Sequence, residues 1–131
     1  MRGFVFDAGA FIALERRSPL LLGILDQVLH GTAEIVLPRT VIAQVWRGSP
    51  RQANVGRLIS AGRAGGSSPV IVDELTAERA RQIGVTIGQT SHPDVVDVHV
   101  ALAAGERGHA VLTSDDADIA RVNPRLIIVH V

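Results

Sequence analysis

Short apolar segments alternate along the chain with longer segments that have helical patterns, and this alternation is the feature that most constrains the fold. The apolar segments are residues 4–6, 35–37, 70–72, 110–112 and 126–129. Each is apolar on successive residues, which is typical of a strand covered on both faces in a parallel sheet. The sequence therefore predicts an α/β fold with a mostly parallel central sheet.

The segments between these strands predict the helices that would cover the sheet. Helical patterns occur at residues 8–16, 20–30, 41–46, 52–61, 76–87, 94–107 and 116–122. The one stretch rich in glycine and serine, residues 62–69, is too short to divide domains and is expected to be a loop. With 131 residues, we expect a single domain over residues 1–131.

Composition excludes several classes of protein. Apolar residues make up 47% of the chain and charged residues 20%, which is too hydrophobic for a disordered protein. No apolar stretch approaches the length of a membrane span, and the first residues lead into a strand rather than a signal peptide. The chain has no cysteine, which fits a reducing compartment. We therefore expect a cytoplasmic protein with no membrane partner.

Aspartates occur where the predicted strands end. Asp7 follows the first strand, and Asp115 follows the strand at 110–112 through Thr113 and Ser114. Asp94 and Asp97 open the helix at 94–107, three residues apart and so on one helical face. Ligands of open parallel sheets gather beyond the carboxyl ends of the strands, which predicts that these aspartates converge.

Converging aspartates favour a divalent cation. Two carboxylates about 4 Å apart repel by roughly 4 kcal/mol at an effective dielectric constant near 20. Mg²⁺ prefers oxygen ligands and usually takes one or two carboxylates, which suits an open aspartate site. Zinc fits less well, because the five histidines have no paired ligand spacing. His92, His99 and His109 are interpreted as structural or exposed.

Each aspartate also has a purely structural interpretation. Asp7 could cap the helix that follows it, and Asp94 could form a capping box with Ser91. Asp115 and Asp118 could together begin another helix. Each position alone is compatible with either interpretation, but their shared place at one edge of the sheet favours a functional site.

Arginine supplies all 13 basic residues of the chain. Guanidinium groups bind phosphate in a bidentate manner, so this composition slightly favours phosphate binding. Four of them, Arg39, Arg47, Arg51 and Arg57, could form a basic rim, although solvated surface is the favoured interpretation. Trp46 stands at helical spacing from Ile42 and is expected to pack in the core.

Four segments resemble the PIN domain family, and in particular the VapC-type toxins of bacterial toxin–antitoxin pairs. They are VFDAGAFIALE, LPRTVIAQVWRG, HPDVVDVHVALAAGERG and AVLTSDDADIARV, and the resemblance covers nearly the whole chain. It implies a three-layer α/β/α PIN-like domain. It also implies metal-binding roles for Asp7, Asp97 and Asp115, an outer-shell role for Asp118, and an orienting role for the Thr113 hydroxyl.

The resemblance further implies an activity and partners. The chain would be an endoribonuclease dependent on Mg²⁺ or Mn²⁺, which hydrolyses RNA with a metal-activated water. Expected partners are an RNA substrate, a small antitoxin and a second copy of the chain in a homodimer. The family commonly has glutamate where this chain has Gln44, and an amide carries no charge. The alternative is therefore a PIN-like binding module with weakened cleavage, acting through a protein or RNA partner.

Two other classes of protein fit less well. A phosphorelay receiver domain also combines a parallel sheet with acidic residues, but it uses a lysine and this chain has none. A nucleotide-binding domain is disfavoured because neither a P-loop nor a G-x-G-x-x-G pattern follows any predicted strand.

Overall fold

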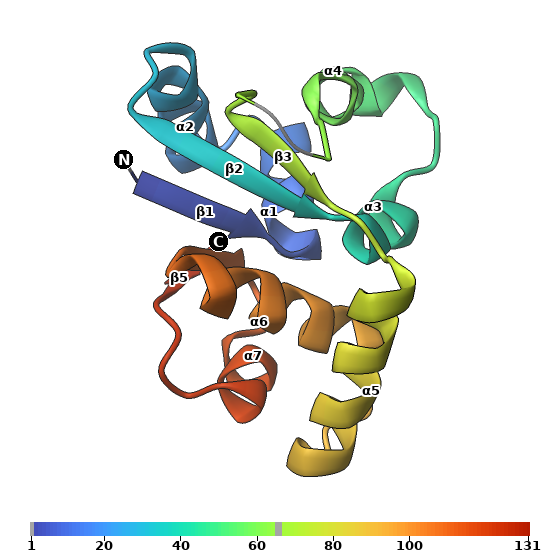
Figure 1. The fold of residues 1–131 in the computed structure, drawn as a ribbon. Coiled ribbons are helices and arrows are strands. Elements are labelled where there is room, and N and C mark those ends of the chain that lie inside the picture. The colour runs from blue at the N-terminus through green and yellow to red at the C-terminus, as the bar shows by residue number, and fades with distance from the viewer. Residues whose placement is uncertain (1, 65–66) are drawn as a thin grey trace.

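The computed structural model describes residues 2–64 and 67–131 and has a five-stranded parallel sheet at its centre (Figure 1). The strands are β1 (Arg2–Phe6), β2 (Ala33–Pro38), β3 (Val70–Asp73), β4 (Ala110–Thr113) and β5 (Ile128–His130). Their order in the sheet is β3-β2-β1-β4-β5, and every pair is parallel. The predicted α/β fold is confirmed. Of the predicted loop 62–69, residues 65–66 lie outside the described residues.

Helices cover both faces of this sheet. They are α1 (Ala8–Glu15), α2 (Pro19–Leu29), α3 (Arg39–Val45), α4 (Ala53–Ala61), α5 (Ala77–Thr90), α6 (Val95–Arg107) and α7 (Asp116–Val122), with a 3-10 turn η1 (Pro50–Gln52) before α4. Figure 1 shows α2 and α4 on one side of the sheet and α5, α6 and α7 on the other. Helix α1 packs against α2 and α4, and α6 packs against α5 and α7. The three layers expected for the fold are present.

The central strands are buried on both faces, which explains their unbroken apolar sequences. Val5 of β1 pairs with Val36 of β2 and with Val111 of β4, and all three side chains are fully buried. The next residue, Phe6, points to the other face and meets Phe11 edge to face at 5.3 Å between ring centroids. Burying each such side chain contributes about 2 kcal/mol.

The strand order reverses between β1 and β4. β2 and β3 lie on one side of this pair, and β5 lies on the other. In open α/β sheets such a switch point opens a crevice at the carboxyl ends of the strands. Asp7 follows β1 and Thr113 ends β4, so the fold delivers both residues to that crevice.

The Trp46 side chain lies at the surface. Trp46 was expected in the core, but it is 41% exposed, and its ring lies over Gly56, where an added Cβ would come within 3.2 Å of the ring. The expectation was wrong because α3 ends at Val45, and the extended backbone that follows turns the indole outward.

In the described part of the chain, no helix has the length and apolar character needed to cross a membrane.

Candidate active site

The buried carboxylate of Asp7 lies at the centre of the candidate site. Its side chain and backbone are 2% exposed. The Asp7 amide donates to Leu112 O at 3.0 Å, and Thr113 Oγ1 donates to Asp7 Oδ2 at 2.6 Å. The Asp115 amide donates in turn to Thr113 Oγ1 at 2.9 Å. These three bonds join the ends of β1 and β4 and bring Asp7 close to Asp115.

Asp7 and Asp115 occupy helix N-cap positions but do not act as caps. Neither side chain makes a capping hydrogen bond to α1 or α7. Asp94 does cap its helix, because its Oδ1 accepts from the Asp97 amide at 2.9 Å. Ser91 takes no part in a capping box; it ends α5 in the left-handed region at φ 57°. The structural interpretation therefore holds for Asp94 and leaves Asp7 and Asp115 for another role.

Asp97 faces the same crevice from the first turn of α6 and is 9% exposed. His92 Nε2 lies 2.8 Å from Asp97 Oδ2, and both side chains are largely buried. Among the described residues, the other oxygen, Oδ1, accepts no hydrogen bond. This contact makes His92 part of the candidate site, a role that was not predicted from the sequence. The only signal for it was a histidine in the turn that leads into the helix carrying Asp97.

The carboxylates act on one another electrostatically. Burial raises the pKa of Asp7, against the hydrogen bonds from Thr113 and from the Ala8 backbone, and the charges of Asp115 and Asp94 raise it further. Burial also raises the pKa of Asp97, against the hydrogen bond from His92, and the charges of Asp94 and Asp7 add to the effect. Aspartates from distant segments thus share one environment, in which a cation would stabilise the ionised forms.

The side chains are not arranged as a complete metal site. Within residues 2–64 and 67–131, no three His, Asp or Glu side chains are close enough together to hold one ion. Asp115 is exposed, so its carboxylate can change rotamer without displacing packed atoms. Asp118 lies 3.6 Å from Arg121 Nη1 on its own helix, with its side chain about half exposed. The donors fit Mg²⁺ in chemistry, and the two buried ones are held by Thr113 and His92.

Gly9 allows the close approach on which this arrangement depends. A Cβ at Gly9 would lie 2.6 Å from Ser114 Oγ and 2.9 Å from Ser114 N. Real Cβ atoms do not come this close to backbone, so any side chain here would push the turn between β4 and α7 outward. That turn carries Asp115, and Gly9 therefore keeps Asp115 near Asp7.

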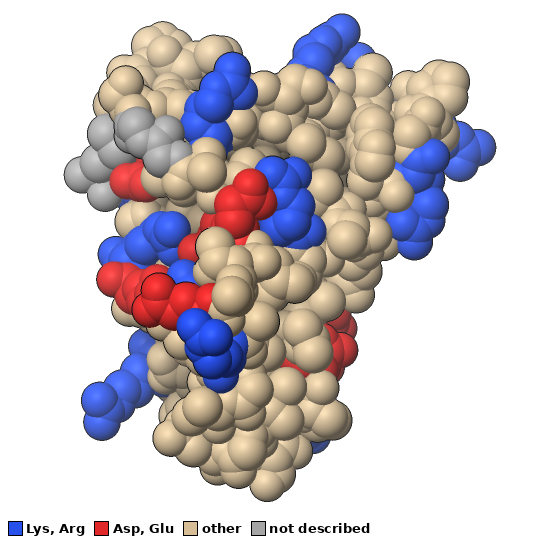
Figure 2. Space-filling model, turned by 45° about the vertical axis from the view of Figure 1, so that its right-hand side comes forward, with Lys and Arg blue, Asp and Glu red and all other residues tan. Residues whose placement is uncertain are grey.

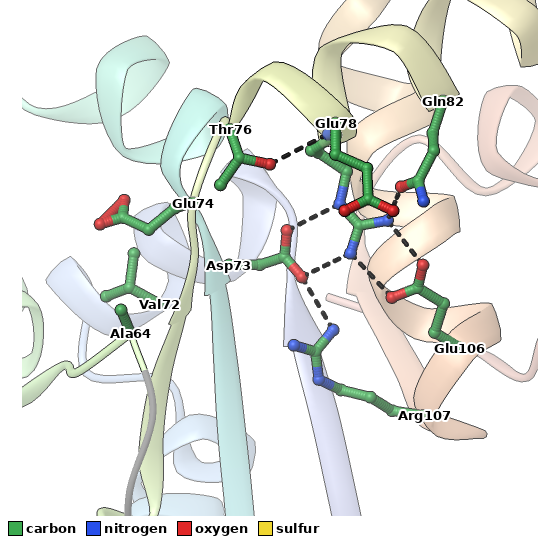
Figure 3. A pocket seen from close by; sticks show the side chains of 10 residues that line it. Ala64, Val72, Asp73, Glu74, Thr76, Glu78, Gln82, Glu106 and Arg107 are labelled. Carbon is green, nitrogen blue, oxygen red and sulfur yellow. Dashed lines mark hydrogen bonds and ion pairs between the residues drawn. The ribbon is translucent and has the colours of Figure 1, made fainter.

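A second polar cluster lies at the end of β3 and was not predicted (Figure 3). Arg79 binds Asp73 through two hydrogen bonds, Nε to Oδ1 at 3.0 Å and Nη2 to Oδ2 at 2.8 Å. Arg107 Nη1 and His99 Nε2 also contact Asp73, at 2.9 and 2.7 Å. The cluster borders a pocket of about 380 Å³. The sequence signal that could have indicated this cluster is the segment VIVD, in which an aspartate follows apolar strand residues, as Asp7 follows the first strand.

The charges of this cluster are paired within the protein. Burial would raise the pKa of Asp73, but hydrogen bonds from His99, Arg79 and Arg107 hold it well below its usual value. Arg79 also binds Glu106 at 2.7 and 2.8 Å, so one guanidinium joins β3, α5 and α6. We interpret the cluster as a clamp that fixes α6, and with it Asp97, against the sheet.

Comparison with known proteins supports the fold. No protein-family model and no curated protein matches the sequence. A crystal structure of VapBC2 from Rickettsia felis, bound to a DNA fragment from their promoter, contains a chain similar to this one. The TM-score is 0.64, and the match covers 98% of each chain at 13% sequence identity. The chain has a PIN-like fold. In this PIN-like fold Asp7 follows β1 and Asp115 follows β4, at the switch point of the sheet.

Proposed function

We propose that this chain is a metal-dependent endoribonuclease and the toxin of a VapBC-type toxin–antitoxin pair. One observation carries the proposal. Asp7 is a buried carboxylate at the switch point of the sheet, makes no capping hydrogen bond, and lies in the field of Asp115 and Asp94. A buried ionised group with like charges nearby is costly unless a partner neutralises it. A divalent cation is the partner that an open carboxylate site selects.

Three aspartates would hold Mg²⁺ or Mn²⁺, namely Asp7, Asp97 and Asp115. When bound, the ion supplies a water of lowered pKa and a counter-charge for the leaving oxygen of the phosphodiester. Thr113 orients the Asp7 carboxylate through Oδ2, and its hydrogen bond lowers the pKa of Asp7 and so favours the ionised form. His92 does the same for Asp97. Asp118 would serve as an outer-shell residue once it turns away from Arg121.

The partners follow from the same proposal. The likeness in fold to a chain of the VapBC2 complex supports an antitoxin as a partner of this chain. RNA as the substrate, a homodimer as the assembly and the cytoplasm as the place of action complete the proposal.

A second candidate function is a PIN-like module that binds RNA or protein without cutting it. Two observations favour it. Gln44 is exposed on α3, where it lines a groove with Ala8, the neighbour of Asp7. An amide at this position supplies no charge to a metal. The described side chains also bring no three ligands together in their present rotamers.

One assay separates the two candidates. Purified protein is incubated with end-labelled RNA and Mn²⁺, beside an Asp97→Asn variant and a sample with chelator. We expect cleavage that the chelator stops and that falls more than about 100-fold in the variant, beyond what loss of an outer-shell partner costs. Equal cleavage by both proteins would contradict the site. No cleavage by wild type, with cleavage restored in Gln44→Glu, would establish the weakened module instead.

A further inference from the structure

The connection between α3 and α4 is a fixed turn held by a buried glutamine. Gln52 is 5% exposed and uses both ends of its amide. Its Nε2 donates to Val45 O at 2.8 Å, and its Oε1 accepts from the Arg47 amide at 2.8 Å. Gly48 completes the turn at φ 71°, a conformation that favours glycine. The backbone that carries Arg47 and Arg51 therefore has a defined place on the surface.

This turn forms one wall of a groove that starts beside the candidate active site. The groove has a volume of about 450 Å³. Its lining includes Ala8, which directly follows Asp7, and Gln44 of α3. Arg47 and Arg51 line the wall formed by the turn, and Glu15 is the one carboxylate among the lining residues. A chain bound in the groove would thus pass next to Asp7.

Several arginines of the chain are paired with carboxylates, and the two arginines of this wall are not among them. Arg39, Arg79 and Arg107 are each paired with a carboxylate. Arg47 and Arg51 are exposed, and neither forms an ion pair within the described residues, although Arg47 Nη1 donates to Trp46 O at 2.9 Å. Figure 2 shows basic side chains gathered on the right of the view, with an acidic patch below them. The groove therefore offers two guanidinium groups to an external anion.

We propose that this groove binds the sugar–phosphate backbone of the RNA strand, with Arg47 and Arg51 contacting phosphates next to the bond that is cut. The inference rests on the proposed function, because it assigns a position to the substrate of that site. Guanidinium groups bind phosphate oxygens in a bidentate manner, and such contacts set the register of a strand without reading its bases. Gln52 is the positioning residue that holds the turn.

The test measures RNA binding without cleavage. A labelled single-stranded RNA is titrated with the protein in chelator over a series of salt concentrations. Each lost phosphate contact reduces the slope of log K against log salt by about 0.7 for a single strand. The double variant Arg47→Gln with Arg51→Gln should therefore reduce the slope by about 1.4. The matched control is Arg81→Gln with Arg125→Gln, two exposed arginines outside the groove lining.

Each outcome decides the inference. A reduced slope in the groove variant and an unchanged slope in the control support it. Equal slopes in both variants and wild type, or an equal loss in both variants, overturn it. A groove variant that loses binding of polyglutamate but keeps the RNA slope also overturns it, in favour of an acidic protein segment. If wild type does not cleave RNA but the groove variant alone has a reduced salt slope, the proposed function fails and the RNA-binding groove stands. If wild type cleaves RNA and all salt slopes are equal, the proposed function stands and the inference about the groove fails.

Discussion

Thr113 Oγ1 donates a hydrogen bond of 2.6 Å to Asp7 Oδ2, although the two residues are 106 positions apart in the chain. The same hydroxyl accepts from the Asp115 amide. One buried side chain therefore supports a buried charge and fixes the backbone of a second candidate ligand.

Replacing Thr113 with valine keeps the shape and removes both hydrogen bonds. Because a buried carboxylate loses its donor, Thr113→Val should lower the free energy of unfolding by about 1–3 kcal/mol. It should also weaken Mn²⁺ binding. Thr113→Ser keeps the hydroxyl and is the control. Urea denaturation and calorimetric titration measure the two effects, and a valine variant as stable as wild type would show that the bond contributes nothing.

Asp7→Asn should change the thermal stability in opposite directions with and without metal. The folded pKa of Asp7 is raised above its ordinary value of 3.8, so its contribution to stability is present at low pH and is lost as pH rises through the folded pKa. At pH 7 in chelator, the neutral asparagine should therefore give a higher melting temperature than wild type. With Mn²⁺ at 100 times its Kd, wild type alone should gain about 2.7 kcal/mol. The same difference in melting temperature between Asp7→Asn and wild type in both buffers would refute this.

His92 should matter for metal binding more than for folding. It holds Oδ2 of Asp97, and loss of such an outer-shell partner typically costs 10–100-fold in metal affinity. His92→Ala should show this loss by calorimetric titration with Mn²⁺, and His92→Gln, which keeps an N–H donor, should recover part of it. His130→Ala is the control, because His130 is exposed and pairs with Asp116. Equal affinity in wild type and His92→Ala would remove His92 from the site.

The clamp at Asp73 should stabilise the fold far more than a neighbouring surface pair does. Removing one partner of a buried ion pair costs about 3 kcal/mol or more, so Asp73→Ala should be strongly destabilised. Glu74→Ala breaks the half-exposed pair with Arg39 and should cost less than about 1 kcal/mol. Denaturation of the two variants compares the pairs directly. Similar losses of unfolding free energy in the two variants would mean that the buried pair stabilises the fold no more than the surface pair does.

The same clamp gives a pH dependence of known sign. The folded pKa of Asp73 is depressed, so its contribution to stability is present above its ordinary pKa of 3.8 and is lost as pH falls toward the folded value. The free energy of unfolding of wild type should therefore fall below pH 4, and that of Asp73→Ala should fall less steeply.

The sequence predicted the elements because their signals are local. The unbroken apolar strands around Val5 and Val111 indicated a parallel sheet, and α7 begins and ends at the predicted residues. The topology of parallel strands then placed Asp7 and Asp115 at one edge. What the sequence could not give were contacts set by side-chain packing: the bond from His92 to Asp97, the clamp around Asp73, and the outward turn of Trp46.

The central claim is that Asp7, Asp97 and Asp115 share a divalent cation, and a crystal grown with Mn²⁺ tests it most directly. Anomalous scattering should locate an ion bound by carboxylate oxygens of Asp7 and Asp97, with Asp115 turned toward it, near the Mg²⁺–oxygen distance of roughly 2.0–2.1 Å. A fully loaded crystal with no ion between these residues, or with manganese bound only elsewhere, would contradict the account.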